Sequence, residues 1–163
     1  RRAMTARADA RWPEPPRLMH PARMARARTT SDDAIIERLR SLCMAFPDAN
    51  ERISHGEPTW FAGKGKVFAM LDNRHHGAAH LSVWLPQRPG VQQELTDEDP
   101  ARFFRPPYVG PSGWVGVVLD TKPSWTRVAA LVRESFLFVA GKRLRERFLL
   151  EEAQGPRPRR LGA

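Results

Sequence analysis

The chain has 163 residues, with 27 Lys and Arg against 18 Asp and Glu, and a single cysteine. This length suits one domain that buries its own core without disulfides or metals. One thiol cannot build a disulfide framework, so we expect a reducing, cytoplasmic environment and a buried, unreactive Cys43. No apolar run approaches the roughly twenty residues that a membrane span needs.

The positive charge lies at the two ends of the chain. Residues 1–30 hold eight arginines and two acids, and residues 155–163 hold three arginines and no acid. Residues 31–154 therefore contain 16 basic and 16 acidic residues. Proline and arginine interrupt any apolar period at both ends, which predicts a disordered basic leader over 1–30 and a disordered basic tail over 155–163. A single neutral domain is expected over 31–154.

The first predicted element is a helix that Thr30 or Ser31 caps. Its apolar residues recur at helical spacing from Ile35 to Phe46, and Pro47 ends it. From Ile53 the period shortens and predicts three strands, about 59–62, 67–71 and 80–85, joined by the turns "GKGK" and "DNRHHG". A short helix is expected next, from about 90 to 98.

The stretch "RFFRPPYVGPSGWVGVVLD", residues 102–120, predicts a proline-rich loop that leads into a strand. A glycine in mid-strand, Gly116, is expected to admit a close approach to the backbone, by the Trp84 indole or by a helix. Ser124 then caps a long helix that is broken near Gly141 and followed by a charged segment. The sequence therefore predicts an α+β domain, an antiparallel sheet of about four or five strands with helices packed against it.

Four segments carry a resemblance to a known family: "ISHGEPTWFAGKGKVFAML", "VWLP", "DPARFFRPPYVGPSGWVGVVLD" and "LVRESFLFVAGKRL". Together they are similar to the MmcQ/YjbR family over roughly residues 31–145. The resemblance implies a small α+β domain with a meandering antiparallel sheet and a double-wing, DNA-binding-like shape.

Several histidines are candidates for metal ligands or a general base. His55 stands beside Glu57 before the first predicted strand, and His75, His76 and His80 follow in and after the turn "DNRHHG". Successive turns of a meander fall at opposite ends of the sheet, so these two groups, which are two turns apart, lie at the same end. No HExxH spacing occurs, so solvated turn histidines are favoured. Ser112 does not fit a nucleophile elbow, because its segment leads into a strand. We expect no catalytic residue, metal or cofactor, and no enzyme activity.

Basic residues interleaved with aromatic ones favour nucleic-acid binding. The candidate phosphate contacts lie on two turns, beside the proline-rich loop and after the last long helix: Lys64, Lys66, Arg74, Arg102, Arg105, Lys142 and Arg143. The two turns fall at opposite ends of the sheet and cannot enter one groove, and Phe103 and Phe104 are favoured as packing residues.

We therefore expect a monomer that binds DNA weakly and largely without sequence preference. The alternative is a non-catalytic interaction module that binds a protein through the sheet edge or the loop around Pro107 and Tyr108.

Overall fold

The computed structural model describes residues 30–75 and 78–155. The predicted leader and tail lie outside this part of the chain, apart from Thr30 and Gly155. Within it, four α-helices, one 3-10 turn and six strands follow one another along the chain: α1 (Thr30–Met44), β1 (Ala49–Ser54), β2 (Glu57–Ala62), β3 (Val67–Asn73), β4 (Leu81–Pro86), α2 (Val91–Glu98), β5 (Phe103–Phe104), η2 (Gly110–Ser112), β6 (Trp114–Val118), α3 (Trp125–Val139) and α4 (Lys142–Ala153).

The strands form one sheet in the order β1-β2-β3-β4-β6-β5, and every neighbouring pair is antiparallel. The predicted α+β class is confirmed, with a strand count slightly above the expected four or five. The two strands that the sequence did not predict are both outermost. The first, β1, reads "ANERIS" and is mostly polar, and β5 has only two residues.

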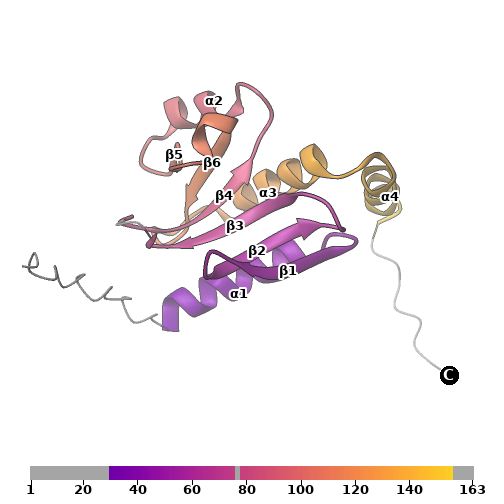
Figure 1. Ribbon diagram of the computed structural model, residues 1–163, viewed down its shortest axis with the longest axis horizontal. Helices are drawn as coiled ribbons and strands as arrows, with labels where there is room; N and C mark the ends of the chain where they lie inside the picture. Colours follow the sequence, from indigo (N-terminus) through magenta and orange to yellow (C-terminus); the bar gives the residue numbers. More distant parts are fainter. Residues whose placement is uncertain (1–29, 76–77, 156–163) are drawn as a thin grey trace, which may run out of the picture.

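One face of the sheet is covered by α1 and α3, which run along it behind the strands in Figure 1. Side chains that alternate along the strands, such as Leu71, Val83 and Val117, point into this core and are almost fully buried. A bulge between Trp60 and Phe61 shifts the β2–β3 register. Phe68 reaches the same core next to the bulge and packs edge-on against the ring of Phe136, at 5.3 Å between ring centroids.

The opposite face of the sheet carries no long helix. Thr59, Met70, Trp84 and Gly116 are cross-strand neighbours on it, in register from β2 to β6. A Cβ on Gly116 would lie 2.3 Å from Cζ of Phe104, so the phenyl ring of β5 covers the backbone of β6 there. The close approach expected at Gly116 is confirmed, and the group that makes it is Phe104, not Trp84 or a helix.

Several local expectations are also met. The Ser124 hydroxyl accepts a hydrogen bond from the backbone N–H of Arg127 at 3.4 Å and caps α3. Cys43 is fully buried, and this burial raises the pKa of its thiol far above the ordinary value, as expected of an unreactive thiol. Among the helices of the described residues, none combines the length and the apolar character that crossing a bilayer requires.

Candidate functional site

The seven basic residues predicted to contact phosphate are distributed over three places. Arg74 lies in the β3–β4 connection, Arg102 and Arg105 flank β5, and the other four lie at the far end of the sheet, on the β2–β3 turn and the first turn of α4. Successive turns of an antiparallel meander alternate between the two ends, so Lys64 and Arg74 are separated by the length of β3. These residues therefore form no single basic face.

The Arg74 side chain forms hydrogen bonds and ion pairs with two carboxylates of the fold. Its guanidinium donates to both carboxylate oxygens of Asp32 at 3.0 and 3.3 Å and to Asp120 Oδ2 at 2.8 Å, which ties the start of α1 to the end of the sheet. The hydrogen bonds to Asp32 are the main cause that raises the pKa of Arg74 above its ordinary value. A phosphate could reach this guanidinium only by displacing a carboxylate, so the geometry argues against Arg74 as a nucleic-acid contact.

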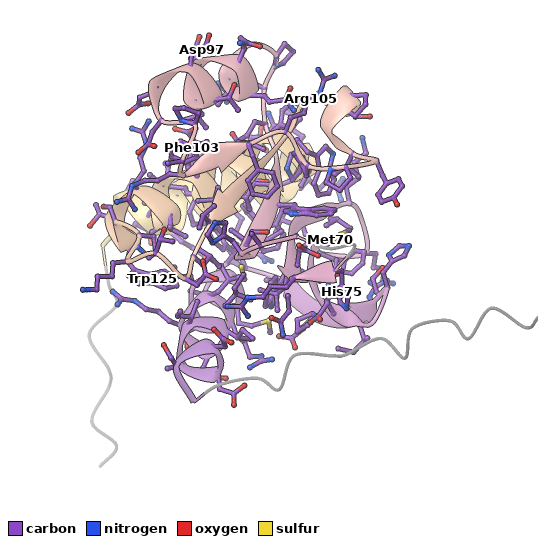
Figure 2. The ribbon with its side chains drawn as sticks, turned by 90° about the vertical axis from the view of Figure 1, so that its left-hand side faces the viewer. Met70, His75, Asp97, Phe103, Arg105 and Trp125 are labelled. Carbon is purple, nitrogen blue, oxygen red and sulfur yellow. The ribbon has the colours of Figure 1, made fainter. Side chains whose placement is uncertain are left out.

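Arg102 and Arg105 lie on either side of the short strand β5. The Arg102 guanidinium contacts Asp99 Oδ2 at 3.2 Å and the backbone carbonyl of Lys122 at 3.4 Å. The Arg105 stem packs over Gly110, where a Cβ would stand 2.5 Å from Arg105 Cγ. Figure 2 shows Arg105 well away from His75. Arg105 is exposed, but no further member of the predicted set stands beside this pair.

The other four predicted residues, Lys64, Lys66, Lys142 and Arg143, lie on two neighbouring elements, and we call this group the basic end. The β2–β3 turn adjoins the first turn of α4: a Cβ on Gly63 would lie 3.7 Å from Cδ2 of Leu144. All four side chains belong to exposed residues, and within the described part of the chain none of them forms an ion pair with a carboxylate. The N-terminus of α4 has Gly141 as N-cap, no side-chain cap and no acid in its first turn. Its backbone N–H groups and its dipole add to the positive potential there.

The open face of the sheet carries a cavity of about 410 Å³, which we call the open-face pocket. Strands β3 and β4 form the floor of the pocket. Its acidic end is formed by β2, β3 and the turns beside them, and the loop before β6 forms the opposite wall. The lining residues are Ser54, His55, Glu57, Met70, Leu71, Asp72, His75, Trp84, Tyr108 and Val109. In Figure 2, Met70 and His75 lie on the side of the molecule away from Trp125 of α3.

His75 stands between two carboxylates at the acidic end of this pocket. Its Nε2 is 3.4 Å from Glu57 Oε1, its Nδ1 is 3.7 Å from Asp72 Oδ1, and its backbone N–H donates to the same Asp72 oxygen at 3.3 Å. The two turns thus meet at one end of the sheet, as the sequence predicts.

The two other histidines of the described residues, His55 and His80, have partners elsewhere. His55 Nδ1 is hydrogen bonded to Ser54 Oγ at 3.0 Å, His80 Nδ1 lies 3.0 Å from Asp120 Oδ1, and His76 is outside the described residues. Among the described side chains, no group of three or more His, Cys, Asp or Glu is arranged to hold a metal ion.

Several non-glycine residues around the pocket have a left-handed backbone conformation. Five non-glycine residues of the described chain have positive φ, and three of them are at this end: His55 at 55°, Arg74 at 59° and Tyr108 at 64°. Such a conformation is costly for a bulky residue such as Tyr108. Tyr108 is also 76% exposed, so it stands at the mouth of the pocket and does not anchor the loop in the core.

A second cavity of about 530 Å³ lies between α2 and α3. Its wall carries both signs of charge, and Arg127 pairs there with Glu98 at 2.8 Å. This mixed lining defines no preference for one class of ligand.

The sequence interpretation found His55, Glu57 and Tyr108 as candidates but missed Met70 and Asp72. The alternation of side chains along β3 was the sequence signal that could have identified these two residues. Met70 and Asp72 alternate with the apolar Ala69 and Leu71, so a polar residue at 72 marks the face that is not packed by helices. The next strand, β4, reads "LSVWLP" and is buried at every position, so its own pattern did not indicate which of its faces stays open.

The fold and the pocket define a small α+β domain with a helix-covered sheet face and a hollowed open face. A model of the YjbR family matches residues 44–138, more than half of the chain. The chain belongs to the YjbR family, which confirms the resemblance seen in the sequence.

Among solved structures, the chain is similar to the Deinococcus radiodurans protein DR2400, described as a DUF419 domain. The two share 23% identity with a TM-score of 0.56, over 72% of this chain and 89% of that one. This likeness concerns the fold alone. A search of curated proteins gave no match.

Proposed function

We propose that this protein binds nucleic acid weakly and without sequence preference, and that the basic end makes the phosphate contacts of the folded domain. The observation that supports this proposal is the convergence of Lys64, Lys66, Lys142 and Arg143 from two separate elements. Cations without carboxylate partners beside an uncapped helix N-terminus are a favourable arrangement for phosphate. The proposed role is binding without catalysis, by a cytoplasmic monomer.

The charge balance of the domain limits this affinity. Residues 31–154 carry equal numbers of basic and acidic residues, so no long-range field draws a polyanion to the domain as a whole. Only the local potential of the basic end acts at short range. We therefore expect binding that weakens steeply with salt and that does not distinguish base sequences.

The test is a titration of the full chain with a labelled DNA duplex at two salt concentrations. Changing Lys64 and Lys66 to Gln should weaken binding and lower the slope of log K against log salt by about 0.9 for each phosphate that the protein no longer neutralises. The matched control changes Arg88 and Arg127 to Gln, which removes the same formal charge from residues that line the cavity between α2 and α3. Equal weakening by the control would show that net charge, not the basic end, determines binding.

A further inference from the structure

The open-face pocket is a feature of the described residues that the proposed nucleic-acid contact does not use. Its volume of about 410 Å³ falls in the range of small-molecule sites, roughly 300–1,000 Å³. Its floor is apolar, made by Met70 and Trp84, which are paired across β3 and β4, and Val109 adds an apolar wall. A few polar groups gather at one end, as they do in sites that orient a ligand.

The pocket lining holds two carboxylates, Glu57 and Asp72, together with the polar side chains of Ser54, His55, His75 and Tyr108. Glu57 is 9% exposed and Asp72 is 3% exposed, and neither Lys nor Arg contributes to the lining. The guanidinium of Arg74, the residue before His75, is directed to Asp32 and Asp120. Carboxylates in a hollow with apolar walls produce a focused negative potential. The pocket therefore favours a cation over a neutral or anionic ligand.

Two aromatic side chains border the same hollow. The Trp84 indole N–H donates to Ser82 Oγ at 3.1 Å, so its hydrogen bond is made within β4 and the ring is left to act as an apolar and π surface. Tyr108 stands exposed at the mouth. Aromatic rings beside carboxylates attract ammonium and guanidinium groups through their quadrupoles and cover the apolar stem to which these groups are attached.

We infer that the open-face pocket binds an organic cation, an ammonium or guanidinium group on an apolar stem about the size of one large side chain. The charge lies at Glu57 and Asp72, and the stem lies between Trp84 and Tyr108. Both acids also contact His75, and a carboxylate can accept several hydrogen bonds at once, since it offers about four lone-pair sites. A free amine and a Lys or Arg side chain of a peptide present this same chemistry.

The experiment is calorimetric titration of the full chain with three probes that share one apolar body: phenethylamine, phenethyl alcohol and phenylpropionate. We expect phenethylamine to bind, the alcohol to bind at least about tenfold more weakly, and the carboxylate to show no binding, since a charge-assisted hydrogen bond is removed or reversed in the last two. Equal or tighter binding of the carboxylate overturns the inference.

Two variants locate the binding. Glu57→Gln should weaken phenethylamine by about tenfold or more and leave phenethyl alcohol unchanged. Glu94→Gln is the matched control, because it removes the same charge from the other cavity and should change neither affinity. Tyr108→Gly should fold, since glycine suits the positive φ there, and should weaken phenethylamine several-fold. If Tyr108→Gly binds as the parent does, or if Glu94→Gln weakens binding as much as Glu57→Gln, the pocket is not the site.

A second set of titrations identifies the source of the cation. One arm uses agmatine, and the other uses a short neutral peptide with a single central arginine against the same peptide with glutamine. Tighter binding of the arginine peptide supports a protein partner, and tighter binding of agmatine supports a small-molecule amine. If neither cation competes with phenethylamine, the inference fails. These outcomes are independent of DNA binding, which uses the opposite end of the sheet.

Discussion

Gly116 determines how closely β5 packs over β6. The Phe104 ring occupies the space that any side chain at 116 would need, with Cζ and both Cε atoms within 2.6 Å of a Cβ placed there. Phe104 is directly opposite Gly116 in the β5–β6 register, and Trp84 is opposite it on β4. The glycine therefore allows two large aromatic residues to flank one strand position on the open face.

Gly116→Ala should lower the free energy of unfolding by about 1–3 kcal/mol, because the new methyl group overlaps the Phe104 ring and forces β5 outward. Denaturant unfolding monitored by circular dichroism measures this change. Gly141→Ala is the control: φ there is −62° and a Cβ meets nothing within 4 Å, so stability should be unchanged or slightly higher. An unfolding midpoint of Gly116→Ala equal to the parent's would show that Phe104 is free to move aside.

Arg74 acts by holding two carboxylates of the fold together. Its side chain is 17% exposed, and Asp32 and Asp120 are 7% and 15% exposed, so removing the cation leaves two acids in poorly solvated positions. Arg74→Met should cost up to about 3–5 kcal/mol, the range for breaking a buried pair, and less to the extent that water still reaches the two acids.

The control for this prediction is Arg127→Met, which breaks an ion pair of the same 2.8 Å length whose side chains are 49% and 59% exposed. Such a surface pair is worth roughly 0.2–1 kcal/mol. Thermal unfolding of the two variants compares them directly. Similar decreases in both would mean that burial of the Arg74 cluster adds nothing to its strength.

At the scale of elements, α4 is the least firmly held helix. None of its residues is buried, and it docks through Leu144, through Phe148 beside Phe46 and Phe136, and through exposed ion pairs to Arg133 and Asp48. Helices with few buried contacts open locally at a lower free energy than the whole domain.

Phe148→Ala should therefore release α4 and leave the rest of the fold intact. We expect the amides of α4 to lose most of their hydrogen-exchange protection while those of α3 keep theirs. Leu150→Ala serves as the comparison, because Leu150 is on the same helix but is 62% exposed. Unchanged protection of α4 in Phe148→Ala would show that the ion pairs alone hold the helix.

The ion pair with Arg133 makes α4 docking sensitive to acid. The hydrogen bonds from Arg133 hold the pKa of Glu152 below its ordinary value. A carboxyl with a lowered folded-state pKa contributes stability at neutral pH, and this contribution is lost as the pH falls through the lowered pKa. Protection factors of α4 amides should thus decrease on acidification in the parent. In Arg133→Met they should show a smaller dependence on pH.

How far the sequence predicted these elements depended on the strength of each local pattern. The α3 helix and β6 were predicted because an apolar stripe, the Ser124 cap and strict alternation agree with one another. The outer strand β1 was missed, because "ANERIS" has almost no apolar alternation and is paired only with β2. The hydrogen bonds from Arg40 and from the Trp60 indole to Glu51 help to hold β1, but they join residues that are distant in the sequence and so cannot be read from the local pattern.

The candidate site was only partly predictable for the same reason. The meeting of His75 with Glu57 followed from the alternation of turns in a meander, which is a topological rule. The role of Arg74 did not follow, because its partners Asp32 and Asp120 are more than forty positions away along the chain. An arginine in a turn has the same local pattern whether it faces solvent or bridges two acids.

At the scale of the whole molecule, charge is partitioned between a neutral domain and basic ends. Residues 1–30 and 155–163 together carry the entire formal net charge of +9. Any nucleic-acid affinity of the full chain should then have two sources. The arginines of the ends provide most of the electrostatic contact, and the basic end of the domain provides a smaller, fixed contribution.

Deleting residues 1–28 and 156–163 separates these two sources, since every described helix and strand is kept. Titration with a DNA duplex at two salt concentrations should show that the trimmed chain loses most of the affinity. The slope of log K against log salt should flatten by about 0.9 for each phosphate that the deleted arginines had neutralised. A neutral polymer of similar size controls for non-electrostatic adsorption, and a melting curve verifies that the trimmed chain is folded.

The DNA affinity that the trimmed chain retains tests whether the basic end contacts phosphate. If the contact proposed there is real, a weak affinity persists, and it falls further when Lys64 and Lys66 are changed to Gln but not when Arg88 and Arg127 are. A trimmed chain that binds as tightly as the full one would show that the arginines of the ends contribute nothing and that the charge argument is wrong. A trimmed chain with no affinity at all would leave the folded domain without a nucleic-acid contact. The open-face pocket would then be its principal binding site.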